Sequence, residues 1–299
     1  MEIPDKLKDF RNFLYIVWSE LNLPEPTPIQ YEIAEYMQRG DKRAIIEGFR
    51  GVGKSWICSA FVVHQLLLDP RKNILVISAS KTRADDFSTF TLRLIHELPV
   101  LAHLKPSDKQ RFSKISFDVG LAPASHAPSV KSLGITSQLT GSRADIIVAD
   151  DVEVPNNSQT QGMRDKLSEQ VKEFDSIIKP EDESRILFLG TPQCEDTIYS
   201  KLAERGYKTR IWTCKYVDQA TNEKTYDGNI SPFCVDSEKK SSSTEPTRFT
   251  DIDLAEREVS YGRSGIARQF MTDTKLSDMD RGPRHTSELL AMDIAPTVA

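Results

Sequence analysis

A glycine-rich octapeptide, GFRGVGKS at Gly48–Ser55, constrains the fold of this chain more than any other feature. It follows a short apolar run, Ala44–Gly48, and precedes an apolar segment with helical periodicity that ends near Leu68. A strand, a glycine-rich turn and a helix in this order form a phosphate-binding loop. The glycines let backbone N–H groups turn inward, and the helix N-terminus adds positive partial charge. The sequence therefore predicts a nucleotide-binding α/β fold.

The residues of this loop have distinct expected tasks. We expect Lys54 to reach the β- and γ-phosphates of ATP, and Ser55 to bind Mg²⁺. ATP and Mg²⁺ are accordingly the expected cofactors. Backbone amides of the loop are expected to contact phosphate oxygens, and they belong to Gly48, Arg50, Gly51, Val52 and Gly53.

An apolar run that ends in acidic residues, IIVADDVE, completes the expected site. Asp150 comes at the carboxyl end of a buried strand, where ligands bind in open parallel sheets, so we expect it to bind Mg²⁺. A second carboxylate is needed to polarise the attacking water. Asp151 is adjacent and Glu153 has the longer reach, and the residues leave the choice between them open.

Further apolar runs without polar alternation predict a parallel sheet covered by helices on both faces. A strong run at Asn73–Ser78 and the long separation between Lys54 and Asp150 favour a sheet in which another strand lies between the loop strand and the acid strand. Helicases and ring motors have this order. We therefore predict a three-layer α/β/α P-loop NTPase of the additional-strand type, with a mostly parallel central sheet. The remaining predicted strands are Arg185–Pro192 and Thr209–Tyr216.

Two more residues fit an ATPase of this group. Gln30, in the segment TPIQ upstream of the loop, has an amide that can donate to and accept from the adenine edge. Thr191, in LFLGTP at a strand end, carries a hydroxyl that can sense the γ-phosphate and pass the change onward. Each segment is also an ordinary loop or turn sequence, so neither identifies an ATPase by itself.

Composition narrows the function. The 299 residues contain no apolar run long enough to span a membrane and no basic-then-apolar start, so a cytosolic location is expected. The net charge is −5, whereas a chain that grips DNA over its whole surface is usually basic. Any contact with nucleic acid must therefore be local or transient. Lys81 and Arg83 are candidates for it, although charges at a helix start are more often simply solvated.

Taken together, three segments resemble the large terminase subunits of tailed bacteriophages, the ATP-driven DNA-packaging motors, and the match is best to the short-tailed phage type. They are GFRGVGKS, VISASKTRADDF and, above all, SLGITSQLTGSRADIIVADDVE. LGTPQ resembles the coupling motif of that family. The acid strand departs from helicases, which usually carry D-E-A-D or D-E-x-H where this chain has Asp150-Asp151.

The resemblance implies an assembly and a location. Such subunits form a ring, expected to contain five copies, on the portal protein of a viral procapsid in the host cytoplasm. A small terminase subunit delivers the double-stranded DNA, which is held by its phosphate backbone without sequence preference. An arginine completes the active site of the same or a neighbouring subunit, and the candidates are Arg50 and Arg143.

The resemblance also frames the domains. We expect residues 1–236 to form the ATPase core with its N-terminal helical, adenine-binding segment, and residues 237–299 to form an exposed linker, over Ser237–Arg248, and a helical lid. The family's C-terminal nuclease needs several converging acids. The segment carrying Asp273, Asp278, Asp280 and Asp293 is too short for a nuclease core, so we expect no nuclease activity.

The predicted function is the ATPase of a DNA-packaging motor. Two alternatives stay open at this point. One is a helicase-like nucleic-acid ATPase, which would need a second recombinase-like domain. The other is a slow ATP-binding assembly or scaffold module. The unusual Asp150-Asp151 pair keeps this alternative open, because such a module would lack the catalytic base.

Overall fold

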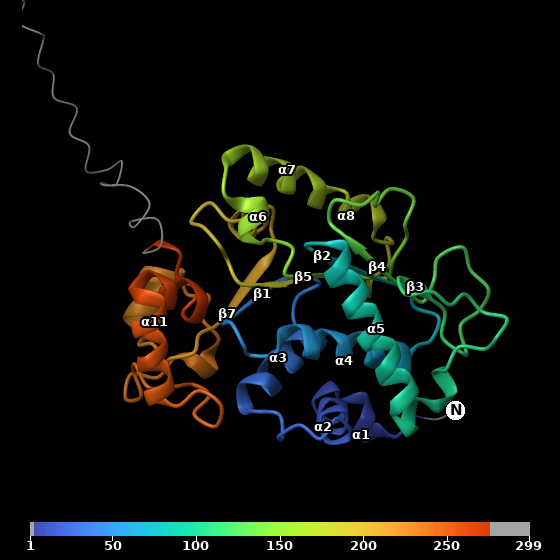
Figure 1. Ribbon diagram of the computed structural model, residues 1–299, viewed down its shortest axis with the longest axis horizontal. Helices are drawn as coiled ribbons and strands as arrows, with labels where there is room; N and C mark the ends of the chain where they lie inside the picture. The colour runs from blue at the N-terminus through green and yellow to red at the C-terminus, as the bar shows by residue number, and fades with distance from the viewer. Residues whose placement is uncertain (1–2, 276–299) are drawn as a thin grey trace, which may run out of the picture.

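The computed structural model describes residues 3–275, and its centre is a seven-stranded sheet in the order β3-β4-β2-β5-β6-β1-β7 (Figure 1). All neighbouring strands are parallel except the pair β3–β4. The strands are β1 (Arg43–Gly48), β2 (Ile74–Ser78), β3 (Ser116–Phe117), β4 (Val130–Gly134), β5 (Ile146–Asp150), β6 (Arg185–Gly190) and β7 (Lys208–Trp212).

Helices cover both faces of this sheet and give the predicted three layers. One layer holds α1 (Asp5–Lys8), α2 (Phe10–Glu20), α3 (Pro28–Arg39), α4 (Lys54–Leu68), α5 (Lys81–Glu97) and the 3₁₀ helix η1 (Pro99–Leu104). On the other side lie α6 (Pro155–Ser158), α7 (Gln161–Lys172), α8 (Phe174–Ile177) and α9 (Ile198–Glu204), and the chain then continues through α10 (Gln219–Tyr226), η2 (Pro232–Cys234) and α11 (Asp251–Phe270).

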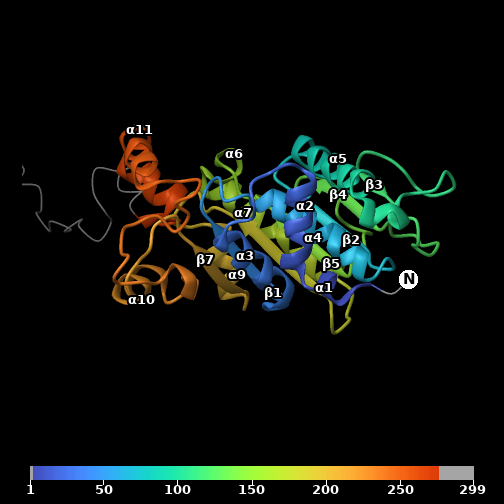
Figure 2. The ribbon, with the colours of Figure 1, turned by 90° about the horizontal axis from the view of Figure 1, so that it is seen from below.

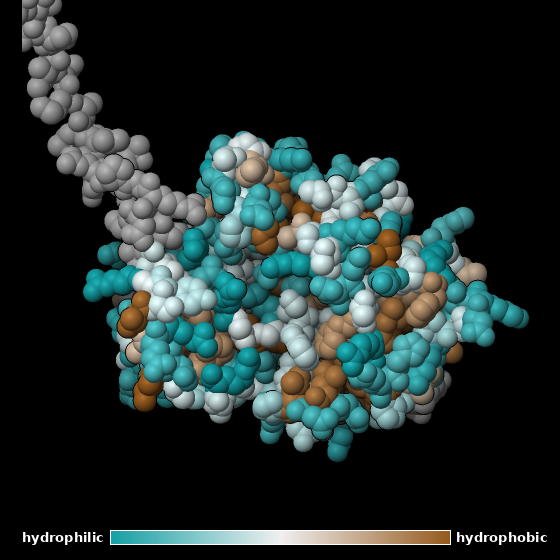
Figure 3. All heavy atoms as spheres, in the orientation of Figure 1, coloured by the Kyte–Doolittle hydropathy of each residue, from teal (hydrophilic) through white to brown (hydrophobic). Residues whose placement is uncertain are grey.

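The central strands are buried on both faces, which is why they read as continuous apolar runs. All five residues of β2 and of β5 are buried. Successive residues of β1 enter opposite cores: Ile46 packs with α2–α5, and Ile45 packs with α7–α9. In the space-filling view, hydrophilic residues cover most of one face, and hydrophobic residues gather where Figure 1 draws α2 and α5 (Figure 3).

Strand order confirms the additional-strand prediction, and β6 is the strand that lies between the loop strand and the acid strand. It pairs with β1 on one side, where Glu47 is opposite Gly190, and with β5 on the other. The run at Ile74–Ser78, which motivated the prediction, instead flanks β5 on its far side.

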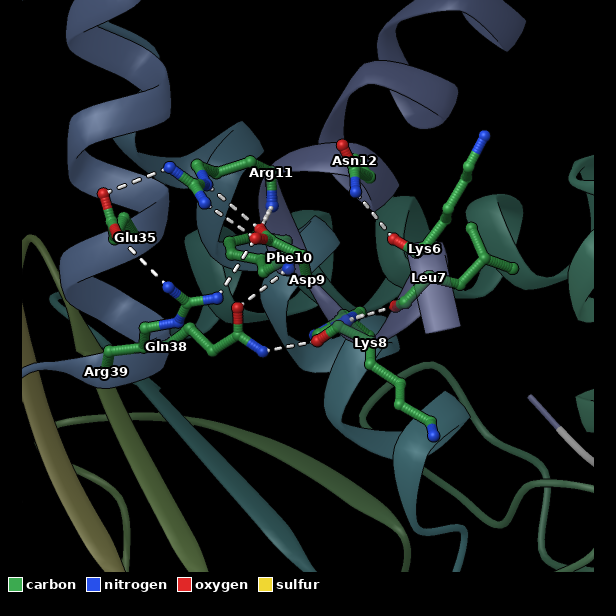
Figure 4. A network of polar contacts seen from close by, with 11 residues as sticks. Lys6, Leu7, Lys8, Asp9, Phe10, Arg11, Asn12, Glu35, Gln38 and Arg39 are labelled. Carbon is green, nitrogen blue, oxygen red and sulfur yellow. Dashed lines mark hydrogen bonds and ion pairs between the residues drawn. The ribbon is translucent and has the colours of Figure 1, made fainter. Parts of the chain in front are cut away.

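The N-terminal helices are fastened to α3 by a polar network (Figure 4). Asp9 caps α2 and receives hydrogen bonds from Arg11 and Arg39, and the Arg11 guanidinium lowers the pKa of Asp9 to about 2. Gln38 accepts from the N–H of Phe10 and donates to the carbonyl of Lys8. This network holds α3, whose N-terminus carries Gln30.

The C-terminal part of the described chain lies at the β7 end of the sheet (Figure 2). Residues Ser237–Lys240 are exposed, as expected for a linker, but residues 243–245 are buried, so the prediction of an exposed linker over the whole of Ser237–Arg248 was wrong. Thr250 caps α11, and Gly262 breaks its regular geometry with a φ of 69°. None of the helices between residues 3 and 275 is both long and apolar enough to cross a membrane.

Candidate nucleotide-binding site

The carboxyl ends of β1, β5 and β6 open into one cavity of about 750 Å³. Its lining brings together residues of the phosphate loop and two of the acidic residues that the sequence singled out, although they lie far apart along the chain. From the predicted set the lining includes Gln30, Arg50, Gly51, Gly53, Lys54, Ser55, Asp151, Glu153 and Thr191. The predicted residues outside the lining are Gly48, Val52, Arg143 and Asp150.

Two glycines of the loop adopt backbone conformations that other residues rarely take. Gly51 has a φ of 93°, and Gly53, the N-cap of α4, has a φ of 98°. The turn therefore depends on glycine at both positions. It leads into the helix that presents Lys54 and Ser55, as the motif predicts.

Lys54 is buried among oxygen acceptors at the base of the loop. Its Nζ donates to the carbonyl of Gly48 at 2.7 Å and to the Thr191 hydroxyl at 3.0 Å. That hydroxyl in turn donates to the Gly48 carbonyl at 2.9 Å. Burial lowers the pKa of Lys54, opposed by the nearby Asp151 and Asp150 carboxylates. Thr191 thus contacts the loop lysine directly.

Asp150 ends β5 and faces the first turn of α4. It is 6% exposed, and its Oδ1 atom is buried without a hydrogen-bond partner among the described residues. Burial raises the pKa of Asp150 to about 7, with the adjacent Asp151 adding to the rise and the Ser55 hydroxyl opposing it. A carboxylate and a hydroxyl side by side, with one buried oxygen unpaired, form the all-oxygen ligand set that Mg²⁺ prefers.

Asp151 and Glu153, the two candidates for orienting water, have different surroundings. Asp151 lies in the left-handed region with a φ of 47°, its N–H donates to the Leu189 carbonyl, and its side chain remains partly exposed to the cavity. Glu153 is buried, and both of its oxygens accept hydrogen bonds. They come from the Thr197 hydroxyl and from the backbone N–H groups of Gln193 and Ile198.

Gln30 connects α3 to the phosphate loop. Its Oε1 accepts from the N–H of Thr27 at 3.0 Å, and its Nε2 donates to the Val52 carbonyl at 2.8 Å. The amide lies at the cavity, as the adenine prediction requires, but both of its ends are already engaged within the protein. Its contact with adenine stays a prediction.

The two candidate arginines lie at opposite ends of the parallel strands. Arg50 follows the carboxyl end of β1, and Arg143 precedes the amino end of β5. Arg50 lines the cavity, and its backbone N–H donates to the Gln269 carbonyl at 2.7 Å. Arg143 precedes β5, and its guanidinium donates to the carbonyls of Ser142 and Ser176. The residues of β5 separate Arg143 from Asp150 by roughly 16 Å of extended strand. Arg143 is therefore not brought to the cavity of its own chain.

Three arginines that the sequence did not place in the site also line the cavity: Arg83, Arg248 and Arg268. Arg83 approaches from the start of α5, with its Nη1 3.7 Å from Asp151 Oδ2. From its charge, Arg83 was a candidate only for contact with DNA. Arg248 lay in the predicted linker. No local signal in the sequence would have placed Arg248 here.

A mostly parallel sheet has a strand between the loop strand and the acid strand, Lys54 and Ser55 line one cavity, and Asp150 is buried beside Ser55. This arrangement defines a P-loop NTPase of the additional-strand class. Comparison with known proteins narrows this class. The family described as terminase large subunit, T4likevirus-type, N-terminal, matches residues 45–179. The large terminase subunit of Enterobacteria phage T3 is 48% identical over 283 residues, which cover 92% of this chain and 48% of that protein. Over 92% of its length, the chain is therefore similar to a large terminase subunit.

A solved terminase structure shares the fold. The HK97 bacteriophage large terminase matches with a TM-score of 0.53 at 10% identity, over 88% of this chain and 54% of that one. The ATPase domain of the Thermus phage P74-26 large terminase matches with a TM-score of 0.49 at 13% identity, over 86% of this chain and 96% of that one. The chain spans about half the length of the T3 relative.

Proposed function

We propose that this chain is the ATPase portion of a viral DNA-packaging motor, and that it hydrolyses ATP to move double-stranded DNA into a procapsid. The observation that carries this proposal is the convergence of Lys54, Ser55 and Asp151 on one cavity, with Asp150 buried beside Ser55, in a chain that is 48% identical to a large terminase subunit. The helicase-like ATPase and the slow scaffold module become outcomes of the test below.

In the proposed mechanism, the chain's own residues bind and orient the triphosphate. The loop amides contact the phosphates, for which Arg50 and Val52 exchange the carbonyls of Gln269 and Phe49 for phosphate oxygens, and Lys54 likewise exchanges its carbonyl partners. Thr191 loses its contact with Lys54 when this happens, so β6 receives a signal that nucleotide has bound. Arg50 stabilises charge on the transferred phosphoryl group.

Asp151 is the residue we assign to the attacking water. Its carboxylate faces the cavity, whereas the two oxygens of Glu153 are occupied by hydrogen bonds that hold the segment after β5 against the start of α9. Glu153 therefore positions the acidic loop. The left-handed backbone at Asp151 is consistent with this assignment, since strained conformations persist where function over-determines them.

Ser55 and Asp150 would hold Mg²⁺, and the buried, unpartnered Oδ1 of Asp150 supports this pairing. When bound, the cation neutralises charge on the phosphate oxygens. Because burial raises the pKa of Asp150 to about 7, a divalent cation must compete with a proton for this carboxylate near neutral pH.

The assembly is proposed on the family relationship. We infer a homo-oligomeric ring, expected to be a pentamer, that docks transiently on the portal of a procapsid in the host cytoplasm and receives DNA from a small terminase subunit. Because Arg143 is remote from its own cavity, only a neighbouring subunit could use it. Residues 237–275 form the proposed linker and lid, and the rest of the predicted segment, with Asp278, Asp280 and Asp293, lies outside the described residues.

ATP turnover of the purified chain, measured with and without double-stranded DNA, tests the proposal. We expect Mg²⁺-dependent hydrolysis without strand separation. Unwinding of a duplex would indicate the helicase-like ATPase. Nucleotide binding with negligible turnover would indicate the scaffold module. The Lys54→Ala variant is the negative control.

A further inference from the structure

The phosphate-binding loop is contacted by the segment Ser243–Phe249, which lies almost two hundred residues further along the chain. Phe249 packs edge-on against Phe49, with ring centroids 5.5 Å apart. A Cβ atom placed on Gly51 would lie 2.8 Å from the Phe249 ring. This segment therefore touches the loop itself.

Arg248 is the polar part of this contact. Its Nη2 donates to the Gly51 carbonyl at 2.7 Å, and its Nη1 lies 3.5 Å from the Val52 carbonyl. The same Nη1 donates to Glu245 Oε1 at 3.0 Å. A guanidinium can serve these acceptors together because its donors are arranged in a rigid fork.

Glu245 extends the contact to the N-terminus of α3. It is 1% exposed, and its Oε1 also accepts a hydrogen bond from the Thr27 hydroxyl at 3.0 Å. Its Oε2 is buried without a hydrogen-bond partner among the described residues. Burial raises the pKa of Glu245 and the Arg248 charge opposes the rise. A buried carboxylate needs a cationic partner, so Glu245 holds the Arg248 guanidinium on one side while the Gly51 carbonyl holds it on the other.

We propose that Arg248 is a positioning residue of the phosphate-binding loop, which holds the carbonyl of Gly51 in place by bridging it to Glu245. A trans peptide carries its C=O and N–H on opposite sides, so a fixed carbonyl also fixes the N–H of the following residue. Gln30 does the same for the Val52 carbonyl. The N–H of Val52, which donates to the Phe49 carbonyl at 3.3 Å, and the N–H of Gly53 are thereby fixed, so less ordering of the loop is required on binding.

This inference rests on the proposed function, because it assumes that the loop binds ATP. The test therefore begins with the unmodified 299-residue chain, for which we measure the Kd for Mg²⁺-ADP by calorimetry and the KM and kcat for ATP. If this chain neither binds nor hydrolyses nucleotide, the proposed function itself fails. If it does both, the variants decide the role of Arg248 separately.

Arg248→Ala is expected to raise the Kd and the KM by about tenfold, with a smaller change in kcat, since a charge-assisted hydrogen bond to the loop is lost before chemistry begins. Arg248→Lys keeps the charge without the fork and should recover part of the affinity. The matched control is Lys240→Gln. Lys240 lies in the same part of the chain and pairs with one carboxylate, Asp218, but does not touch the loop.

Thermal unfolding without nucleotide is measured for every variant, because a merely structural role would lower this stability and leave the Kd alone. Should Arg248→Ala not fold, Glu245→Gln replaces it, since it removes the charge that holds Arg248; a severalfold rise in Kd is then expected. Equal Kd values for Arg248→Ala, Lys240→Gln and the unmodified chain would overturn the proposal, as would full affinity in Glu245→Gln when that variant takes its place.

Discussion

Replacing Gly51 by alanine should destabilise the protein through two separate effects at the phosphate-binding loop. The first is backbone strain, because Gly51 has a φ of 93° and an L-residue in left-handed conformations costs about 1–2 kcal/mol. The second is a clash, because the new Cβ would lie 2.8 Å from the Phe249 ring. That ring packs against both Phe49 and Phe270, so it cannot swing aside freely.

The clash adds roughly 1–3 kcal/mol, the usual range for overpacking, so the total loss is about 2–5 kcal/mol. Gly206→Ala is the matched control, since Gly206 has a φ of 91° and nothing lies within 4 Å of the position that a Cβ would take there. It should show the backbone cost alone. Urea unfolding of both variants, followed by circular dichroism, gives the two free energies of unfolding.

A second comparison isolates the contact with Phe249. In the double variant Gly51→Ala, Phe249→Leu, the smaller side chain should restore part of the loss, so the two changes should be non-additive. Equal destabilisation by Gly51→Ala and Gly206→Ala would refute the reasoning, because it would mean that Phe249 does not confine the loop.

Three further predictions concern residues of the cavity and Glu47, a buried carboxyl group in β1. Asp151→Asn should lower kcat by about 10²–10⁴-fold with little change in nucleotide affinity, whereas Glu153→Gln should mainly lower the unfolding midpoint; steady-state kinetics and thermal melts of both variants distinguish the assignments. Burial, together with the charge of Glu153, raises the pKa of Glu47 to about 8. A protonated Glu47 therefore favours the folded state fully below pH ~4.5, the ordinary glutamate value, and this contribution is lost as the pH rises towards 8. Glu47→Gln should accordingly be the more stable protein at about pH 9 and lose that advantage at about pH 5, and a urea midpoint that shows the same gap at both values would contradict the assignment. Arg50→Gln should weaken ATP hydrolysis by the isolated chain and Arg143→Gln should not, because only Arg50 lines the cavity of its own chain.

Local sequence was sufficient for the parts of the site whose chemistry is local. The loop needs glycine where φ is positive and needs Lys54 and Ser55 at the start of a helix, and all of these are neighbours in the chain. Strands buried on both faces leave continuous apolar runs, so β5 and its terminal Asp150 were also readable. The helix α4 has the bounds that its periodicity predicted.

Contacts between distant segments were not readable, because they depend on side-chain geometry in three dimensions. The sequence left Asp151 and Glu153 as equal candidates, and only the packing of α9 shows that Glu153 has no free oxygen. The sequence also did not reveal the position of β6. This strand comes after β1 and β5 in the chain, yet it lies between them in the sheet.

Composition misjudged the segment before α11 for the same reason. Serines, lysines and prolines indicate an exposed linker, and residues 237–240 are exposed. A few residues later, Glu245 and Arg248 are drawn onto the loop by partners in other parts of the chain, Thr27 and Gly51. Periodicity and motif spacing record what a residue does with its neighbours in the chain. The energy of a partly buried ion pair such as Arg248–Glu245 also depends on groups that folding brings together from elsewhere.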